Sequence, residues 1–228
     1  MRAWRNVPVA ACLVVTATAC SAASAPDRAN TGSMDQQSTS ISASPPILSV
    51  PPTTVAPQPD LELETRDADG RTPLVVATKA GDVEAARTLI LAGADVNAED
   101  NMSDSAFLYA GAEGMDEILI LTLAHGADVR SLNRFGGTAL IPAAEKGHPT
   151  TVQLLIDAGV PLDHVNDSGW TALLEAVVYG DGSQSYQEVV GRLVAAGADP
   201  DIRDLQGRTA LDNARIRGQS GVVRLLGG

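Results

Sequence analysis

A short glycine-led motif returns along this chain at a nearly constant interval. Gly-Ala-Asp begins at Gly93, Gly126 and Gly197, and a diverged copy, Gly-Val-Pro, begins at Gly159. A second motif that begins with Thr or Ser starts at residues 72, 105, 138, 171 and 209, so its intervals are 33, 33, 33 and 38 residues. Both motifs gain the same five residues between the same two copies, which indicates one insertion within a true repeat. A fixed period of this length predicts a solenoid.

The first unit, residues 67–99, predicts a turn followed by two short antiparallel helices. The Asp-x-Asp-Gly sequence that begins at Asp67 is typical of a turn. Thr72 is a suitable helix N-cap, and Pro73 is tolerated at the first helical position because no N–H is needed there. Gly81 can end the first helix in the left-handed conformation. Because one such helix pair buries too little surface alone, neighbouring units must stack into a continuous core.

These features resemble the ankyrin repeat. The matching segments are Asp69-Gly70, Thr72-Pro73-Leu74, Ala80-Gly81 and Gly93-Ala94-Asp95-Val96-Asn97. The resemblance implies an all-α solenoid of helix pairs joined by short β-hairpin turns, with about four full repeats and a truncated C-terminal cap. We assign the units to residues 67–99, 100–132, 133–165, 166–203 and 204–228.

Three departures from the repeat are expected to change the structure locally. Pro142 lies within the first helix of the third unit and removes one backbone hydrogen bond near its start. The residues inserted in the fourth unit fall within residues 180–186 and are expected to lengthen the loop between its two helices. At the N-terminal end, residues 61–64 are too few for a helix pair, so the first unit is either capped by polar residues alone or frayed.

The residues before the repeats predict a signal, an acylated cysteine and a tether. Arg2 and Arg5 precede a mostly apolar stretch that is shorter than the about 20 residues of a membrane-spanning helix. Ala17-Thr18-Ala19-Cys20 resembles a bacterial lipobox, although Ala17 stands where Leu is usual; ordinary cleavage beside an incidental Cys20 is the alternative. We assign residues 1–19 to a signal peptide, 20–59 to lipidated Cys20 and a disordered Ser/Thr/Pro/Ala-rich tether, and 60–228 to the repeat domain.

Acylation would give the single cysteine of the mature chain a role, since Cys12 lies inside the signal. A lipobox cysteine carries at least two acyl chains, such as palmitate, which is enough for stable anchoring. The sequence therefore predicts an extracytoplasmic lipoprotein anchored to the bacterial cell membrane. A soluble secreted or periplasmic protein is the alternative.

Charge and motif content argue against nucleic-acid binding and catalysis. From residue 60 onward there are 26 Asp and Glu against 13 Lys and Arg, a balance that repels nucleic acid and anionic lipid. The acids either keep a secreted solenoid soluble or form a surface for a basic partner. No phosphate-binding loop and no Gly-x-Ser-x-Gly motif is present, and His125, His148 and His164 stand singly. We therefore predict no enzymatic activity, no metal site and no cofactor.

The resemblance also implies where a protein partner would bind, because turn tips and first helices form the concave surface of an ankyrin stack. Non-repeating residues at those positions are the candidates. Phe135 and Trp170 are expected at turn tips and Tyr179 at the end of a first helix, with Arg134 and Glu145 around them. Aromatic residues and arginine are enriched in binding hot spots. For Trp170 the alternative is packing against a neighbouring turn.

The sequence thus predicts a non-catalytic protein-binding module, a scaffold or adaptor tethered outside the cytoplasm. The alternative is an inhibitor or immunity protein that uses its acidic face against a secreted enzyme or toxin. Function would then lie in the residues that do not repeat, because a fold of this kind does not fix function.

Overall fold

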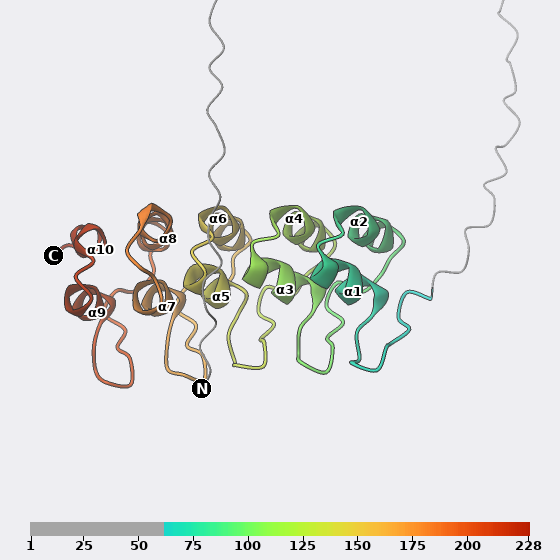
Figure 1. Cartoon of the computed structure of the whole chain (residues 1–228), viewed down its shortest axis with the longest axis horizontal. Coiled ribbons are helices and arrows are strands. Elements are labelled where there is room, and N and C mark those ends of the chain that lie inside the picture. The colour runs from blue at the N-terminus through green and yellow to red at the C-terminus, as the bar shows by residue number, and fades with distance from the viewer. Residues whose placement is uncertain (1–61) are drawn as a thin grey trace, which may run out of the picture. The chain divides into compact units, whose positions relative to one another are not determined.

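The computed structural model describes residues 62–228, which form five helix pairs. The pairs are α1 (Pro73–Ala80) with α2 (Val83–Leu91), α3 (Ala106–Glu113) with α4 (Asp116–Ala124), α5 (Leu140–Glu145) with α6 (Pro149–Asp157), α7 (Ala172–Val178) with α8 (Gln184–Ala195), and α9 (Ala210–Ile216) with α10 (Ser220–Leu225). The first helices form an inner row, the second helices form an outer row, and the loops between units project beyond the inner row (Figure 1). The all-α solenoid expected from the repeat is confirmed.

The loops that join the units contain no β-strand within residues 62–228, although short β-hairpin turns were expected there. An Asp or Asn side chain closes each loop instead. Oδ1 of Asp67 accepts the backbone N–H groups of Asp69 (2.9 Å) and Arg71 (3.0 Å). The same two bonds, to the residues two and four positions later, recur at Asp100, Asn133, Asn166 and Asp204. These side-chain bonds hold each loop together with a few backbone bonds, such as that from the Asp67 N–H to the carbonyl oxygen of Arg71 (3.1 Å).

The N-cap residues expected from the sequence begin most of the inner helices. Thr72 accepts the N–H of Val75, and Ser105, Thr171 and Thr209 form the equivalent bond at α3, α7 and α9. Gly81 ends α1 with φ of 69°. Each cap satisfies a helix-terminal N–H that would otherwise lack a partner.

Pro142 removes one backbone hydrogen bond near the start of α5, as the sequence predicted, and α5 is also short. The helix has six residues, whereas α1 and α3 have eight. Because proline has no N–H, the carbonyl of Thr138 accepts instead from Ile141 (3.2 Å). The Ile141 N–H is then unavailable to the Thr138 hydroxyl, and that buried oxygen has no hydrogen-bond partner among the described residues.

The insertion in the fourth unit is mostly helical, so the expectation of a simply longer loop was wrong in part. α8 has 12 residues, whereas α2, α4 and α6 have nine each. The loop between α7 and α8 spans residues 179–183, and the one between α5 and α6 spans 146–148. Most of the insertion therefore adds a turn to the start of α8. Tyr186 in that turn donates its hydroxyl to the carbonyl oxygen of Glu145 (2.9 Å), which ties the added turn to the preceding unit.

Buried apolar side chains from both rows make one core that runs the length of the stack. Small residues allow the inner helices to approach closely. A Cβ atom placed on Gly111 would lie 2.9 Å from the Cβ of Ala139, so α3 can lie against the start of the third unit only with glycine there. At the N-terminal end no helix precedes α1 in the described residues, and Leu63 packs partly against the core.

A second set of side-chain bonds links the segment before the first unit to that unit, the first unit to the second, and the third unit to the fourth. Glu64 accepts the N–H of Asp95 (3.0 Å), and Asn97 accepts that of Asp128 (2.8 Å). Asp163 accepts that of Asp199 (2.9 Å). At the corresponding place between the second and third units stand Arg130, whose side chain has no acceptor, and Pro161, which has no N–H. The diverged Gly-Val-Pro motif therefore lies at a junction where this link cannot form.

Candidate protein-binding groove

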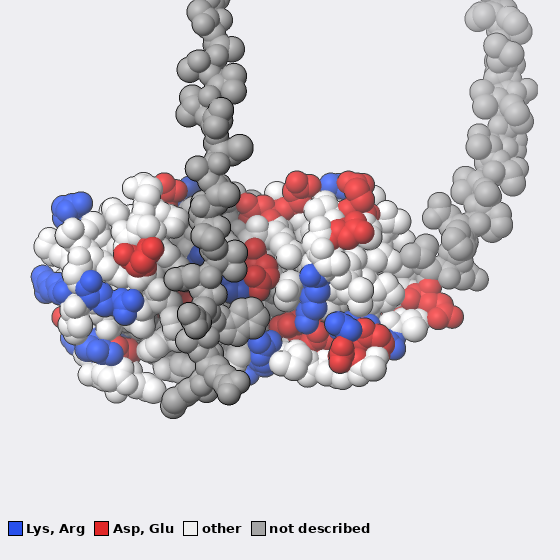
Figure 2. Space-filling view, in the orientation of Figure 1, with Lys and Arg blue, Asp and Glu red and all other residues white. Residues whose placement is uncertain are grey.

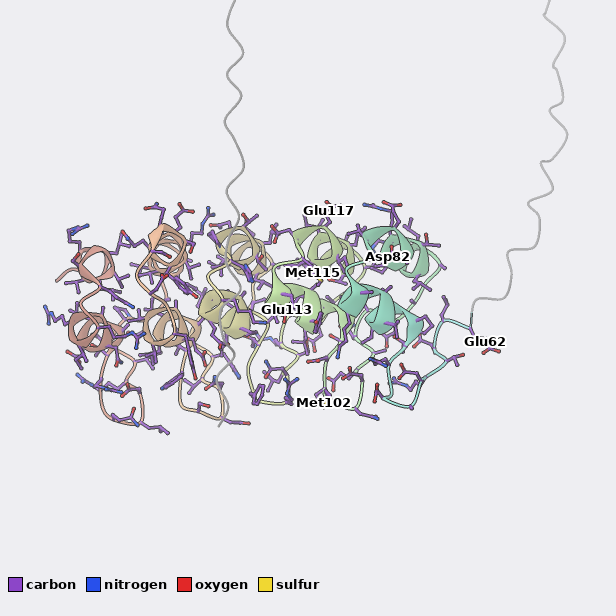
Figure 3. The ribbon with its side chains drawn as sticks, in the orientation of Figure 1. Glu62, Asp82, Met102, Glu113, Met115 and Glu117 are labelled. Atoms are coloured by element: carbon purple, nitrogen blue, oxygen red, sulfur yellow. The ribbon has the colours of Figure 1, made fainter. Side chains whose placement is uncertain are left out.

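A groove of about 410 Å³ opens on the face made by the inner helices and the loops. Its walls come from α3, α5, α7 and the loops that lead into α5 and α7. Figure 3 labels three residues of the second unit that lie at different heights. Met102 lies at the loop tip, Glu113 lies beside the inner row of helices, and Glu117 lies on the outer row. Glu113 lines the groove, which therefore lies at the inner level.

Four of the five residues expected to bind a partner line this groove: Arg134, Phe135, Glu145 and Tyr179. Phe135 and Tyr179 are 56% and 54% exposed, so both side chains are available to a partner. The Arg134 guanidinium lies 4.6 Å from the centre of the Phe135 ring, within reach of a cation–π interaction. The structure thus brings together residues from the third and fourth units.

Trp170, the fifth expected residue, is half-buried and packs partly against the core. Its ring meets that of Tyr179 edge to face, with centroids 5.3 Å apart and planes at 67°. This placement favours packing as the main role of Trp170. The indole supports the exposed Tyr179 ring in a favourable aromatic geometry.

Glu175 on α7 is a residue of this groove that the sequence analysis missed. Its side chain is only 6% exposed, and its Oε1 accepts a hydrogen bond from Nδ2 of Asn166 (2.8 Å). Burial raises the pKa of this carboxyl to about 7; the Asn166 bond opposes the rise and the nearby Glu145 adds to it. Aligning the repeats could have found it, because the equivalent residues are Val76, Tyr109, Pro142 and Asn213, none of them a carboxylic acid.

Glu145 on α5 is the second carboxyl group in the groove. Burial raises its pKa; Lys146 opposes this rise and Glu113 adds to it. The pKa of the Tyr179 hydroxyl is also raised, first by burial and then by Glu175 and Glu145. The interior of the groove is therefore a place where negative charge is costly unless a cation is present.

Comparison with known proteins identifies the fold family. The model of a single ankyrin repeat matches residues 69–101, and a model of three ankyrin repeats matches residues 107–204. The crystal structure of an ankyrin repeat domain from Acinetobacter baumannii AYE is 55% identical and has a TM-score of 0.71, over 72% of this chain and 84% of that one. The chain belongs to the ankyrin repeat family. The crystal structure of EF0377, an ankyrin repeat protein, is 46% identical with a TM-score of 0.70, over 73% of this chain and 84% of that one. No curated protein matches the chain.

Family membership confirms the resemblance drawn from the sequence, and ankyrin repeats act as protein-binding scaffolds. In this ankyrin stack the basic side chains around the groove are already paired. Lys79 bridges Asp100 and Asp104 (2.9 Å to the latter), and Arg134 also reaches Asp104 (3.5 Å). Lys146 pairs with Glu113. None of these ion pairs involves Glu145 or Glu175.

The histidines of the ankyrin repeats lie apart from one another. A ring nitrogen of His125 lies 2.8 Å from the carbonyl oxygen of Leu121, and one of His164 lies 2.6 Å from that of Gly136. Within residues 62–228 no group of three His, Cys, Asp or Glu side chains is arranged to hold a metal ion. The same part of the chain has no helix with the length and apolar character needed to cross a membrane. Cys20 and the segments predicted to be a signal peptide and a tether lie outside the described residues.

Proposed function

We propose that this ankyrin repeat protein is a non-catalytic protein-binding module held outside the cytoplasm, and that the groove across its second to fourth units is the binding surface. The observation that carries the proposal is the pair of exposed rings, Phe135 and Tyr179, beside an open groove on a stack of packed helices. Aromatic anchors next to arginine are the usual centre of a protein interface. A stack that changes shape little also loses little entropy when a partner binds.

Affinity capture from bacterial envelope extract tests this surface. The immobilised full chain is compared with a Phe135→Ala/Tyr179→Ala variant, and the captured proteins are quantified. Loss of two exposed hot-spot rings is expected to reduce capture of a specific partner at least about tenfold. Each substitution also removes one aromatic contact, to Arg134 or to Trp170, so the double variant should lose about 1–2 kcal/mol of the free energy of unfolding.

A matched control removes exposed apolar side chains elsewhere. Leu91 on α2 and Leu205 at the last loop are 67% and 76% exposed, and both lie outside the groove. The Leu91→Ala/Leu205→Ala variant should capture the partner as the parent does. Equal capture by the parent and the Phe135→Ala/Tyr179→Ala variant would remove the groove as the binding surface.

The tether and its anchor are the second part of the proposal. The small residues before Cys20, and the Ser, Thr, Ala and Pro tract after it, in which Asp27, Arg28 and Asp35 are the charged residues, support acylation of that cysteine. Cells given radiolabelled fatty acid should label the parent chain, and Cys20→Ser should abolish the label and release the protein into the soluble fraction. An unlabelled parent would favour the soluble secreted or periplasmic alternative, and label that persists in Cys20→Ser would refute the assignment.

An inhibitor or immunity protein is the second candidate function, and the distribution of charge favours it. Residues 67–132 hold 12 Asp and Glu against four Lys and Arg, whereas residues 204–228 hold two against four. Figure 2 shows this asymmetry on the face in view, with acidic side chains toward α1–α4 and basic ones toward α9 and α10. An inhibitor should capture one basic enzyme or toxin, with affinity that falls steeply as salt rises, and should block its activity. Capture of several envelope proteins favours a scaffold.

A further inference from the structure

Glu175 presents a buried carboxyl group to an open groove. One oxygen, Oε1, accepts the hydrogen bond from Asn166, and the other has no donor among the described residues. The side chain is more than nine-tenths buried and yet lines the groove, so the second oxygen is accessible only from within it. A polar group in this position is costly unless a hydrogen-bond donor is supplied.

The surroundings of Glu175 define what would supply that donor. Glu145 places a second carboxyl group in the same groove, and the two raise each other's energy when both are ionised. The neighbouring cations Lys79, Arg134 and Lys146 are held by other acids. The groove therefore holds carboxyl groups without a cation of their own, and a positively charged group is the complement that it lacks.

The walls of the groove are aromatic. Tyr109 on α3 and Tyr179 after α7 line it together with Phe135. Lys79, which lies outside the groove lining, is 5.2 Å from the centre of the Tyr109 ring, so this ring already interacts with one ammonium group. Aromatic faces accommodate the methylene stem of a long basic side chain and attract its charged head.

We propose that the groove receives a lysine or arginine side chain of the partner protein, with its charged head between Glu145 and Glu175 and its stem against Tyr179. This inference rests on the proposed protein-binding function and specifies the chemistry of the anchor. An ammonium or guanidinium group carries several N–H donors, so it can satisfy the free oxygen of Glu175 and reduce the repulsion between the two carboxyl groups. A neutral or acidic side chain would not reduce the repulsion between the two carboxyl groups and would give the free oxygen of Glu175 no charged donor.

The same geometry makes binding depend on pH. A cation favours the ionised carboxyl, and burial holds the pKa of Glu175 at about 7 in the free protein. The charged and titratable groups that share the groove are Glu145 on α5, Glu113 and Tyr109 on α3, Tyr179 after α7, Lys146 after α5, and Asp104 and Arg134 on the loops. Since Glu175 is mostly protonated at pH 6 and mostly ionised at pH 8, affinity should rise about tenfold between them.

Nuclear magnetic resonance titration of the purified full chain tests the cation site. The probes are the N-acetyl methylamides of lysine and arginine, with those of norleucine and citrulline as neutral controls of similar shape. The cationic probes should give saturable shifts at the Tyr179 ring and the Trp170 indole, with dissociation constants on the order of millimolar. They should bind about tenfold more tightly at pH 8 than at pH 6.

Two variants with equal charge change complete the titration. Glu175→Gln keeps the acceptor for Asn166 and should weaken the cationic probes at least about fivefold and abolish the pH dependence. Glu188→Gln removes the same charge from an exposed position on α8, outside this groove, and should bind as the parent does. Equal shifts from the neutral probes, no saturation by the cationic ones, or an unchanged Glu175→Gln would each overturn the proposal.

Partner capture separates this inference from the binding function on which it rests. A Glu145→Gln/Glu175→Gln variant should lose the partner that the parent captures from envelope extract. If capture is lost in Phe135→Ala/Tyr179→Ala but kept in Glu145→Gln/Glu175→Gln, the protein-binding function stands and the basic anchor is refuted. If the cationic probes bind and no protein is captured, the cation site stands and the protein-binding function fails.

Discussion

Replacing Glu175 by glutamine should stabilise the ankyrin stack at high pH and leave it unchanged at low pH. The side chain is 6% exposed, and glutamine keeps an oxygen that can accept the hydrogen bond from Asn166. Only the ability to lose a proton is removed. The substitution therefore isolates the free energy that the buried carboxyl costs when it ionises.

The magnitude follows from the pKa of the carboxyl, which is about 7 in the folded chain against an ordinary value of 4.5. The folded state binds this proton more tightly than the unfolded state, so its stabilising effect is complete below pH 4.5 and is lost as the pH rises to 7. The difference corresponds to about 3 kcal/mol. Glu175→Gln should therefore match the parent near pH 4.5 and exceed it by about 3 kcal/mol at pH 8.

Urea unfolding followed by circular dichroism measures this difference at pH 4.5, 6 and 8. Glu188→Gln is the matched control, because it removes the same charge from an exposed site and should show no pH-dependent gain over the parent. Groups remote from Glu175 titrate alike in the parent and in Glu175→Gln, so their contributions cancel, and the coupling of Glu175 to Glu145 and Tyr179 is part of the measured difference. A constant difference across the three pH values, or a parent that is the more stable protein at pH 8, would refute the reasoning.

Three further tests, which use four substitutions, probe the contacts that shape the stack. Arg130→Asn with Pro161→Asp should rebuild the missing link between the second and third units; a double-mutant cycle in urea should show a favourable coupling of about 0.5–1 kcal/mol, and additive single effects would contradict it. Pro142→Ala should return an N–H group to α5 and raise the free energy of unfolding by about 1–2 kcal/mol; a thermal midpoint at or below that of the parent would count against this account. Tyr186→Phe should cost about 1 kcal/mol and speed amide exchange in residues 180–183; parental exchange rates would show that the hydroxyl does not hold the added turn.

The helix pairs could be predicted from the sequence because their signals are local. The helix cap at Thr72, the turn at Asp67 and the hydrogen bond lost at Pro142 each depend on residues only a few positions apart. The structure shows all three where they were expected. The fixed period then extended these local features to the whole stack.

What the sequence could not show depends on residues that are distant along the chain. The extra turn of α8 is fastened by a bond from Tyr186 to Glu145, 41 residues away. The raised pKa of Glu175 requires burial between units and the nearby charge of Glu145. The half-burial of Trp170 likewise depends on how its unit packs against the core. These contacts, the raised pKa and the burial all arise when units stack, so they cannot be predicted from the sequence pattern of a single unit.

The missing link at Arg130 and Pro161 lies in the middle of the stack, next to the shortened α5. In a linear array each unit is stabilised by its neighbours alone, so the first two units and the last three form two blocks that are joined here by the contacts that remain, among them the Thr151–Asp116 hydrogen bond and the Glu113–Lys146 ion pair. The groove takes residues from both sides of this junction, with Glu113 on one side and Glu145 and Glu175 on the other. Whatever occupies it therefore contacts both blocks at once, and binding should make the unfolding of the ankyrin stack more cooperative.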